Sequence, residues 1–294
     1  MTPRMTGILL MMASMVVFTL LDASAKYVMH SLPPPVAVFF RYFVAALLSA
    51  GVVMKAGGPS LLVTRYPFLQ VVRGLLLMVS TVFNFIAMSH LQLAQTAAIF
   101  FTIPLWVCAL SVPLLGEQVG YRRWIAVTIG FLGVLVIMRP GTGSFHWAML
   151  FSIAASICGA TYNIVTRKVS GGDRAETSLF YVSVIGATAA SFPLPWTWQL
   201  PQGIAWPLLI FMGLAGGIGH YMLIQAHRLA PASVLAPFVY TQIVWMIIVG
   251  FLVFRDVPDL WTLVGAFIVV SSGLFVFARE RKLGRETSVP APGD

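Results

Sequence analysis

An acid and a base stand one helical turn apart in the stretch FTLLDASAKYV, residues 18–28, inside a long apolar run. On a helix, Asp22 and Lys26 share one face, so they can form an ion pair that lowers the cost of burying each charge. A helix that begins near Gly7 places Asp22 about 22 Å along its axis, past the middle of a bilayer. Lys26 can extend its ammonium group toward the outer surface. The pair predicts a helix end that only fixes orientation, a polar wall of an outer vestibule, or a proton-responsive group. An ion pair between Asp22 and Arg41 stays open.

Other polar side chains also interrupt apolar runs, where they are costly and usually face the interior of a helix bundle. They are Asn84, Tyr162, Asn163, His220, Tyr221 and Gln242. Their hydrogen-bonding groups suit an ammonium or a carboxylate group of a substrate, and His220 could also titrate near neutral pH. The alternative is that they join helices by hydrogen bonds worth about 1 kcal/mol each.

Two prolines, Pro104 and Pro237, interrupt two further apolar runs. A proline inside a helix frees a carbonyl group and kinks the backbone, and such breaks lie beside the substrate in many transporters. A kink that only improves packing is the alternative.

The same runs carry aromatic side chains far from their ends, where rings with a polar handle suit a partly wet pocket. Each ring could equally face lipid or pack in the core. These rings are Phe101, Trp106, Tyr240 and Trp245.

These residues together predict a central substrate-binding cavity. The predicted substrate-binding residues are Asn84, Phe101, Pro104, Trp106, Tyr162, Asn163, His220, Tyr240, Gln242 and Trp245, and the predicted vestibule pair is Asp22 and Lys26. The enclosing segments should be 67–89, 93–115, 204–228 and 231–254, with 6–29 and 146–169. No cofactor or metal is expected, because the two cysteines, Cys108 and Cys158, lie within apolar runs and match no disulfide or zinc pattern.

The elements that position these residues must be membrane helices. Of the 294 residues, 59% are hydrophobic and 9% are charged, at a mean hydropathy of +0.91, whereas a soluble domain averages about a quarter charged residues. A helix crosses the bilayer core with about 20 apolar residues, and the runs lack the alternation of barrel strands. The sequence therefore predicts an all-α integral membrane protein. Its ten transmembrane helices are expected near residues 6–29, 36–54, 67–89, 93–115, 123–138, 146–169, 176–196, 204–228, 231–254 and 259–278.

The net charge of +9 indicates orientation, because basic residues gather in cytoplasmic loops. With a cytoplasmic N-terminus, most Lys and Arg residues fall at inner helix ends, and only Lys26, Arg139 and Arg255 fall on the outer side. Both termini are therefore expected in the cytoplasm, in a multi-pass protein of the inner (plasma) membrane. The first run and the Ala23-Ser24-Ala25 stretch imitate a signal peptide, but the internal repeat requires this run as a helix.

The chain repeats itself at a shift of 139 residues, which lays the third and fourth predicted helices on the eighth and ninth without a gap. The coincident identities include Gly74 with Gly213, Ala97 with Ala236, Thr102 with Thr241 and Trp106 with Trp245. Because each unit holds five helices, an odd number, the second unit enters the membrane inverted, as in alternating-access transporters. The predicted units are residues 1–142 and 143–280, followed by a disordered cytoplasmic tail, 281–294. A shift of 142 lays Asp22 on the apolar Ile164, which favours a charge pair at the outer mouth over a symmetric ion-coupling site.

Several motifs resemble the EamA-type members of the drug/metabolite transporter superfamily. They are FFRYFVAALL around Arg41, AQTAAIFFTIPLWVCALSVPLLGEQVG with WIAVTIGFLGVLVI, and APASVLAPFVYTQIVWMIIVGFLVFRD with LVGAFIVVSSG. The likeness covers nearly all of residues 5–280, and Arg255-Asp256 departs from the Gly-Glu pair that is kept as Gly116-Glu117. The resemblance implies ten helices in two inverted halves. Among relatives, bacterial exporters of amino acids, including aromatic ones, look most similar.

The predicted function is export of small metabolites, above all aromatic and other neutral amino acids, by alternating access. Only Arg41 and Arg73 lie within spans, which argues for a neutral or zwitterionic substrate. Export of other metabolites or drugs stays open. A channel or an intramembrane enzyme is disfavoured, because the sequence has no ring of charges, no HExxH motif and no paired intramembrane carboxylates. The expected partners are a small molecule and the lipid bilayer, without nucleic acid, and the expected state is a monomer or a weak dimer.

Overall fold

The computed structural model describes residues 3–115, 120–169, 172–230 and 232–286, and all regular elements among them are helices. The first half contains α1 (Pro3–Val28), α2 (Pro34–Ala56), the 3-10 helix η1 (Gly58–Leu62), α3 (Pro67–His90), α4 (Leu93–Phe100), α5 (Ile103–Leu115) and α6 (Tyr121–Met138). The second half contains α7 (Ala148–Val169), α8 (Ala175–Ser191), α9 (Leu194–Thr197), α10 (Ala205–Leu229), α11 (Ala232–Val239), α12 (Thr241–Val249), the π-helix η2 (Gly250–Phe254) and α13 (Leu260–Glu286).

Seven helical stretches of the described residues are long and apolar enough to cross a membrane. They are Pro3–Val28, Pro34–Ala56, Pro67–His90, Leu93–Leu114, Tyr121–Met138, Ala148–Thr166 and Ala205–Leu223, and the shorter apolar helices Thr241–Phe254 and Leu260–Val276 accompany them. Large apolar side chains stay exposed on the outside of the bundle, such as Leu47 at 60% and Phe267 at 74%. Lipid, not water, suits such a surface, so the chain is a multi-pass membrane protein.

Two of the predicted segments are each divided into two helices. The segment 93–115 is interrupted at Phe101 and Thr102, between α4 and α5, and the segment 231–254 is interrupted at Tyr240, between α11 and α12. Pro104 is therefore the second residue of α5 instead of a kink in one long helix. The first turn tolerates proline because its N–H group would lack a helical partner in any case.

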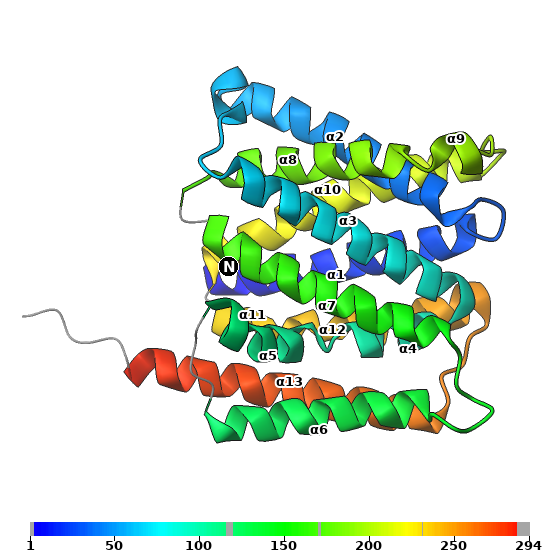
Figure 1. Cartoon of the computed structure of the whole chain (residues 1–294), viewed down its shortest axis with the longest axis vertical. Coiled ribbons are helices and arrows are strands. Elements are labelled where there is room, and N and C mark those ends of the chain that lie inside the picture. Colours follow the sequence, from blue (N-terminus) through cyan, green and yellow to red (C-terminus); the bar gives the residue numbers. More distant parts are fainter. Residues whose placement is uncertain (1–2, 116–119, 170–171, 231, 287–294) are drawn as a thin grey trace, which may run out of the picture.

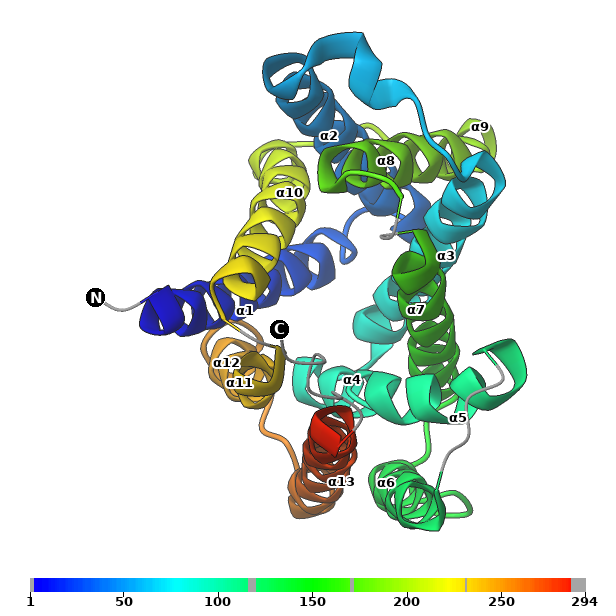
Figure 2. The same cartoon turned by 90° about the vertical axis from the view of Figure 1, so that its left-hand side faces the viewer.

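The long helices stand in a ring when the molecule is viewed end-on (Figure 2). Each helix of the first half packs on one of the second: α1 on α10, α2 on α8, α3 on α7, and α6 on α13. The start of α1 and the end of α13 lie at the same end of the bundle (Figure 1). This end is called the terminal end below. α13 continues to Glu286, six residues into the predicted disordered tail, and residues 287–294 of that tail lie outside the described part.

Glycines bring two helix pairs, α6 with α13 and α2 with α10, into close contact. A Cβ atom on Gly265 of α13 would lie 2.6 Å from the backbone oxygen of Gly133 on α6. On α10, Gly213 and Gly217 lie against Val44 and Leu48 of α2, where added Cβ atoms would stand 2.4 Å from each side chain. Small residues allow such approach between membrane helices.

Candidate functional site

A cavity of about 490 Å³ lies between α2, α3, α7, α8 and α10. It extends from Gly216, near the middle of α10, to Asp173, in the link between α7 and α8. This link lies at the terminal end of the bundle (Figure 1). The polar side chains of the wall include Arg41, Arg73, Tyr162, Asn163, Ser183 and His220. The cavity therefore brings two positive charges and several hydrogen-bonding groups into the interior of an apolar bundle.

Arg41 of α2 lines this cavity, and its guanidinium group forms few interactions with other residues. Its Nη1 atom donates to the hydroxyl of Thr81 at 3.4 Å, and its Cζ atom lies 5.7 Å and 5.5 Å from the ring centres of Tyr42 and Phe85. Tyr42 and Thr81 share a hydrogen bond of 2.8 Å, which holds the hydroxyl that Arg41 uses. None of the ion pairs among the described residues involves Arg41. No described carboxylate lies within ion-pair distance of Arg41, so its guanidinium group is suited to an anionic ligand group.

Arg73 of α3 is buried, with 3% of its surface exposed, and is held more firmly. Its Nη2 atom donates to the backbone oxygen of Ser178 on α8, and its Cζ atom lies 5.6 Å from the ring centre of Tyr162. The Nε atom finds no hydrogen-bond partner within the described residues. Arg73 thus retains one free donor beside the cavity that it lines.

Asp173 adds a negative charge where the cavity meets the terminal end. The Thr64 hydroxyl, the Arg65 backbone N–H at 2.9 Å and the Gln70 amide at 2.8 Å all donate to its carboxylate. Burial alone would raise the pKa of Asp173, but these hydrogen bonds and the charge of Arg73 outweigh it, so the pKa lies below the ordinary 3.8. The charged carboxylate is already saturated by these donors, which tie the link after α7 to the segment before α3.

Three of the predicted substrate-binding residues line this cavity, namely Tyr162, Asn163 and His220. The Nδ1 atom of His220 donates to the backbone oxygen of Gly216 at 2.8 Å, and the ring meets Phe18 edge-on with centroids 5.0 Å apart. The cavity includes walls from α2 and α8, which the sequence prediction left out. The sequence feature that could have located this cavity is the pair of arginines within spans, Arg41 and Arg73. The sequence analysis used them only to argue for a neutral or zwitterionic substrate.

The other predicted substrate-binding residues lie outside this cavity wall, and substrate contact with them stays a prediction. Phe101 and Tyr240 meet where the two interrupted segments face each other, with ring centres 5.4 Å apart. Trp106 packs on Phe131 of α6, at 4.5 Å between ring centres. The remaining ones are Asn84, which donates to the sulfur of Met88, Pro104 at the start of α5, Gln242 beside Asp22, and Trp245, whose indole N–H has no partner among the described residues.

The structure gives Lys26 a different partner from the one that the sequence predicted. The Nζ atom of Lys26 donates to Asp256 Oδ2 at 2.7 Å and to the backbone oxygen of Leu91 at 2.9 Å, and lies 4.8 Å from the ring centre of Phe254. The expected ion pair with Asp22 is therefore wrong. The i,i+4 spacing brings Asp22 and Lys26 to one face, but the chain after η2 brings a carboxylate closer to the ammonium group.

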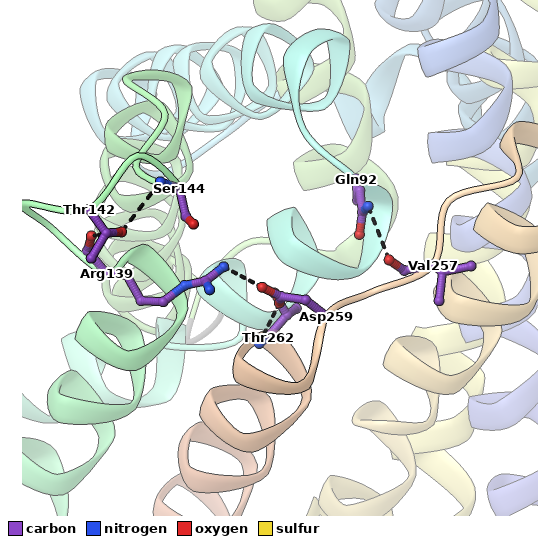
Figure 3. A network of polar contacts seen from close by, with 7 residues as sticks. All are labelled: Gln92, Arg139, Thr142, Ser144, Val257, Asp259 and Thr262. Carbon is purple, nitrogen blue, oxygen red and sulfur yellow. Dashed lines mark hydrogen bonds and ion pairs between the residues drawn. The ribbon is translucent and has the colours of Figure 1, made fainter.

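Two further contacts hold the segment 256–259 (Figure 3), which lies at the end of the bundle opposite the terminal end (Figure 1). The Gln92 amide donates to the backbone oxygen of Val257 at 3.3 Å, and Arg139, at the end of α6, forms an ion pair with Asp259. Burial alone would raise the pKa of Asp259, but hydrogen bonds from Thr262 and the charge of Arg139 outweigh it and hold the pKa below its ordinary value. With Lys26, these contacts join the segment to α1, to the link before α4, and to α6. We call residues 256–259 and these contacts the distal clasp.

Comparison with known proteins matches this arrangement to transporters. The S-adenosylmethionine uptake transporter of Rickettsia felis is 28% identical over 278 residues, covering 95% of this chain and 94% of that protein. The riboflavin transporter of Vibrio cholerae is 28% identical over 286 residues, covering 95% of both, and the pseudopaline exporter of Pseudomonas aeruginosa is 26% identical over 268 residues, covering 90% and 93%. A crystal structure at 16% identity shares the fold with a TM-score of 0.66, covering 94% of this chain and 98% of the other. Residues 5–139 and 146–278 each match the EamA-like transporter family, so the chain belongs to that family of membrane transporters.

Proposed function

We propose that the protein is an alternating-access carrier for small metabolites that bear a carboxylate group, above all amino acids and their derivatives. It crosses the inner membrane ten times, as two inverted five-helix repeats with both termini in the cytoplasm. The match of the family to each half separately supports the two repeats, and the bias of basic residues toward one side supports the orientation. The cavity then opens toward the cytoplasm, while the distal clasp closes the outer side.

The observation that carries the substrate class is Arg41, a guanidinium group without a carboxylate partner among the described residues. A planar guanidinium binds a carboxylate through two parallel hydrogen bonds. Arg73, with a free Nε donor, and His220 lie on the same wall. A volume of about 490 Å³ falls in the range of small-molecule sites, roughly 300–1,000 Å³. These features fit a metabolite with an anionic end and an apolar or aromatic body.

The named substrates of the relatives agree with this chemistry in part. S-adenosylmethionine is an amino-acid derivative with a free carboxylate, whereas riboflavin has none. The relatives are named for both uptake and export, and a carrier can run in either direction. The export expected from the resemblance is therefore one direction of the proposed cycle, and the gradients across the membrane decide which direction prevails.

The test is binding of radiolabelled L-phenylalanine and S-adenosylmethionine to the purified protein, with phenethylamine as the analogue that lacks the carboxylate. Arg41→Gln should weaken binding of both carboxylates by about tenfold or more, since a charge-assisted hydrogen bond contributes about 1.5–3 kcal/mol. Arg41→Lys should restore part of the loss. Arg122→Gln, a change at the exposed start of α6, is the matched control and should bind as the wild type does.

Two results would contradict the proposal. Phenethylamine could bind as tightly as phenylalanine, or Arg41→Gln could bind both carboxylates normally. The probes should also be recovered chemically unchanged from proteoliposomes after transport, whereas a modified product would indicate an enzyme.

A further inference from the structure

Asp22 is a carboxylate inside the bundle with almost no hydrogen-bond support. It is the only acidic residue of the sequence that stands away from the end of a predicted span. The one hydrogen bond to its side chain within the described residues comes from the Gln242 amide, at 3.5 Å, the outer limit of such a bond. Lys26, the cation one turn away, is occupied by Asp256 and Leu91. The charge of Asp22 therefore needs compensation from elsewhere.

Arg41 is the cation placed to supply it. A Cβ atom on Gly216 would lie 3.6 Å from the side chain of Leu21, the neighbour of Asp22, and 4.0 Å from Nε of Arg41. Leu21 and the guanidinium group of Arg41 therefore both border Gly216, and the charge of Arg41 acts on Asp22. Arg41 also lines the cavity. One guanidinium group can therefore face either Asp22 or a ligand.

Among the side chains that the structure describes, the other elements around Asp22 offer no competing charge at this level. From α10, His220 faces Phe18, one turn before Asp22, and its Nδ1–H donates to the backbone oxygen of Gly216. From α12, the neighbour is the neutral Gln242, and the sequence of α11 has no titratable residue. In α3, the titratable residues Arg73 and His90 lie toward its two ends. Arg41 is thus the cation whose charge acts on Asp22.

We propose that Asp22 is the proton-binding residue of the carrier, and that Arg41 couples its proton to the carboxylate of the substrate. The mechanism rests on the carrier function proposed above. In the empty carrier, Arg41 compensates the negative charge of Asp22. A substrate carboxylate that binds Arg41 takes over this positive charge, so Asp22 takes up one proton from the aqueous side to which the site is open. Release of the substrate on the other side returns Arg41 to Asp22, and the proton leaves.

This coupling has a direction. Substrate binding and proton binding favour each other, and the linkage is reciprocal. Substrate and proton therefore cross together, and an inward proton gradient drives uptake. A zwitterionic amino acid has no net charge, so its transport with one proton carries one positive charge across the membrane.

The test measures proton uptake by the purified full-length protein in a weakly buffered solution that contains a pH indicator. Addition of saturating L-phenylalanine or S-adenosylmethionine should remove about one proton from solution per bound molecule. The dissociation constant should rise by up to about tenfold per pH unit across the pH range in which binding takes up the proton, the limit for one linked proton. Asp22→Asn should bind the probe without proton uptake and without this pH dependence, and Asp22→Glu should restore both. Glu176→Gln, which removes a carboxylate near the start of α8, is the matched control and should keep both.

Three other results would overturn part or all of the proposal. Proton uptake that persists in Asp22→Asn would overturn the assignment of Asp22. A wild type that binds the probes without proton uptake would overturn the coupling and leave the carrier intact, whereas a wild type that binds no carboxylate probe would overturn both proposals. If Asp22→Asn does not fold, infrared difference spectra of the wild type can test whether probe binding protonates an aspartate. Probe binding should create a protonated carboxyl band that shifts when aspartate alone is labelled with carbon-13, and a spectrum without that band would overturn the proposal.

Discussion

At the scale of the residue, the ion pair between Lys26 and Asp256 determines the stability of the distal clasp. The exposed fractions of the two side chains are 10% and 24%, so loss of one partner leaves a poorly solvated charge. Lys26→Met should lower the free energy of unfolding by about 1–3 kcal/mol, less than the 3–5 kcal/mol of fully buried pairs. The double change Lys26→Met with Asp256→Asn should cost less than the sum of the single changes, because no orphan charge remains.

The measurement is the thermal midpoint of the detergent-purified variants. Lys55→Met, which removes an exposed lysine at the end of α2, is the control and should change stability by no more than about 0.5 kcal/mol. Additive losses in the double variant would mean that the two side chains do not stabilise each other.

The partner of Lys26 also shows where sequence reasoning at this scale ends. The i,i+4 rule describes an isolated helix, and by that rule Asp22 was the natural partner. Asp256 lies 230 residues further along the chain, and the packing of α12 on α1, with the turn after η2, brings it to Lys26. No local sequence pattern indicates that Lys26 and Asp256 form an ion pair. The charge of Arg41, in contrast, was visible in the sequence, although its place in a cavity wall was not.

At the scale of the element, hydropathy predicted the helical stretches because each must bury its backbone hydrogen bonds in lipid. The predicted runs 67–89 and 123–138 agree with α3 and α6 to within two residues at each end. Breaks in these two segments were expected at Pro104 and Pro237, but the interruptions lie at Phe101–Thr102 and at Tyr240. Hydropathy could not locate them, since both lie within strongly apolar sequence and a hydropathy window averages over them. Pro104 signalled the first interruption, but a proline permits either a kink or a new first turn.

The pairing of α6 with α13 depends on Gly265 and Gly133, which bring the two backbones together. Gly265→Ala places a methyl group 2.6 Å from the backbone oxygen of Gly133, so the helices must separate. Strain of this kind typically costs about 1–3 kcal/mol, and the thermal midpoint should fall accordingly. Gly51→Ala, in α2, is the matched control: nothing lies within 4 Å of the added Cβ atom, so this variant should be neutral or up to about 1 kcal/mol more stable. Equal midpoints for Gly265→Ala and the wild type would show that the contact does not limit the pairing.

At the scale of the whole molecule, the cavity and the distal clasp occupy opposite ends of one ring of helices. The cavity reaches the terminal end through Asp173, while the clasp joins α1, α6 and the link before α4 to the segment before α13. The four pairs α1–α10, α2–α8, α3–α7 and α6–α13 each join a helix of the first half to one of the second. A carrier built in this way can open the distal side only if the clasp contacts part, because they tie the two halves together there.

A reversible cross-link across the clasp should therefore stop transport without closing the cavity. The pair Gln92→Cys and Val257→Cys, introduced after Cys108→Ala and Cys158→Ala, can be joined by a thiol-specific bis-methanethiosulfonate reagent, because the Gln92 amide lies 3.3 Å from the backbone oxygen of Val257. Uptake of radiolabelled phenylalanine into proteoliposomes should be lost on cross-linking and return on reduction. Binding to the detergent-purified protein should persist, since the cavity is reached from the terminal end. Each single-cysteine variant, treated in the same way, should transport normally. If mass spectrometry shows complete cross-linking while transport continues at the wild-type rate, the clasp does not part during the cycle, and the distal end is not the outer gate.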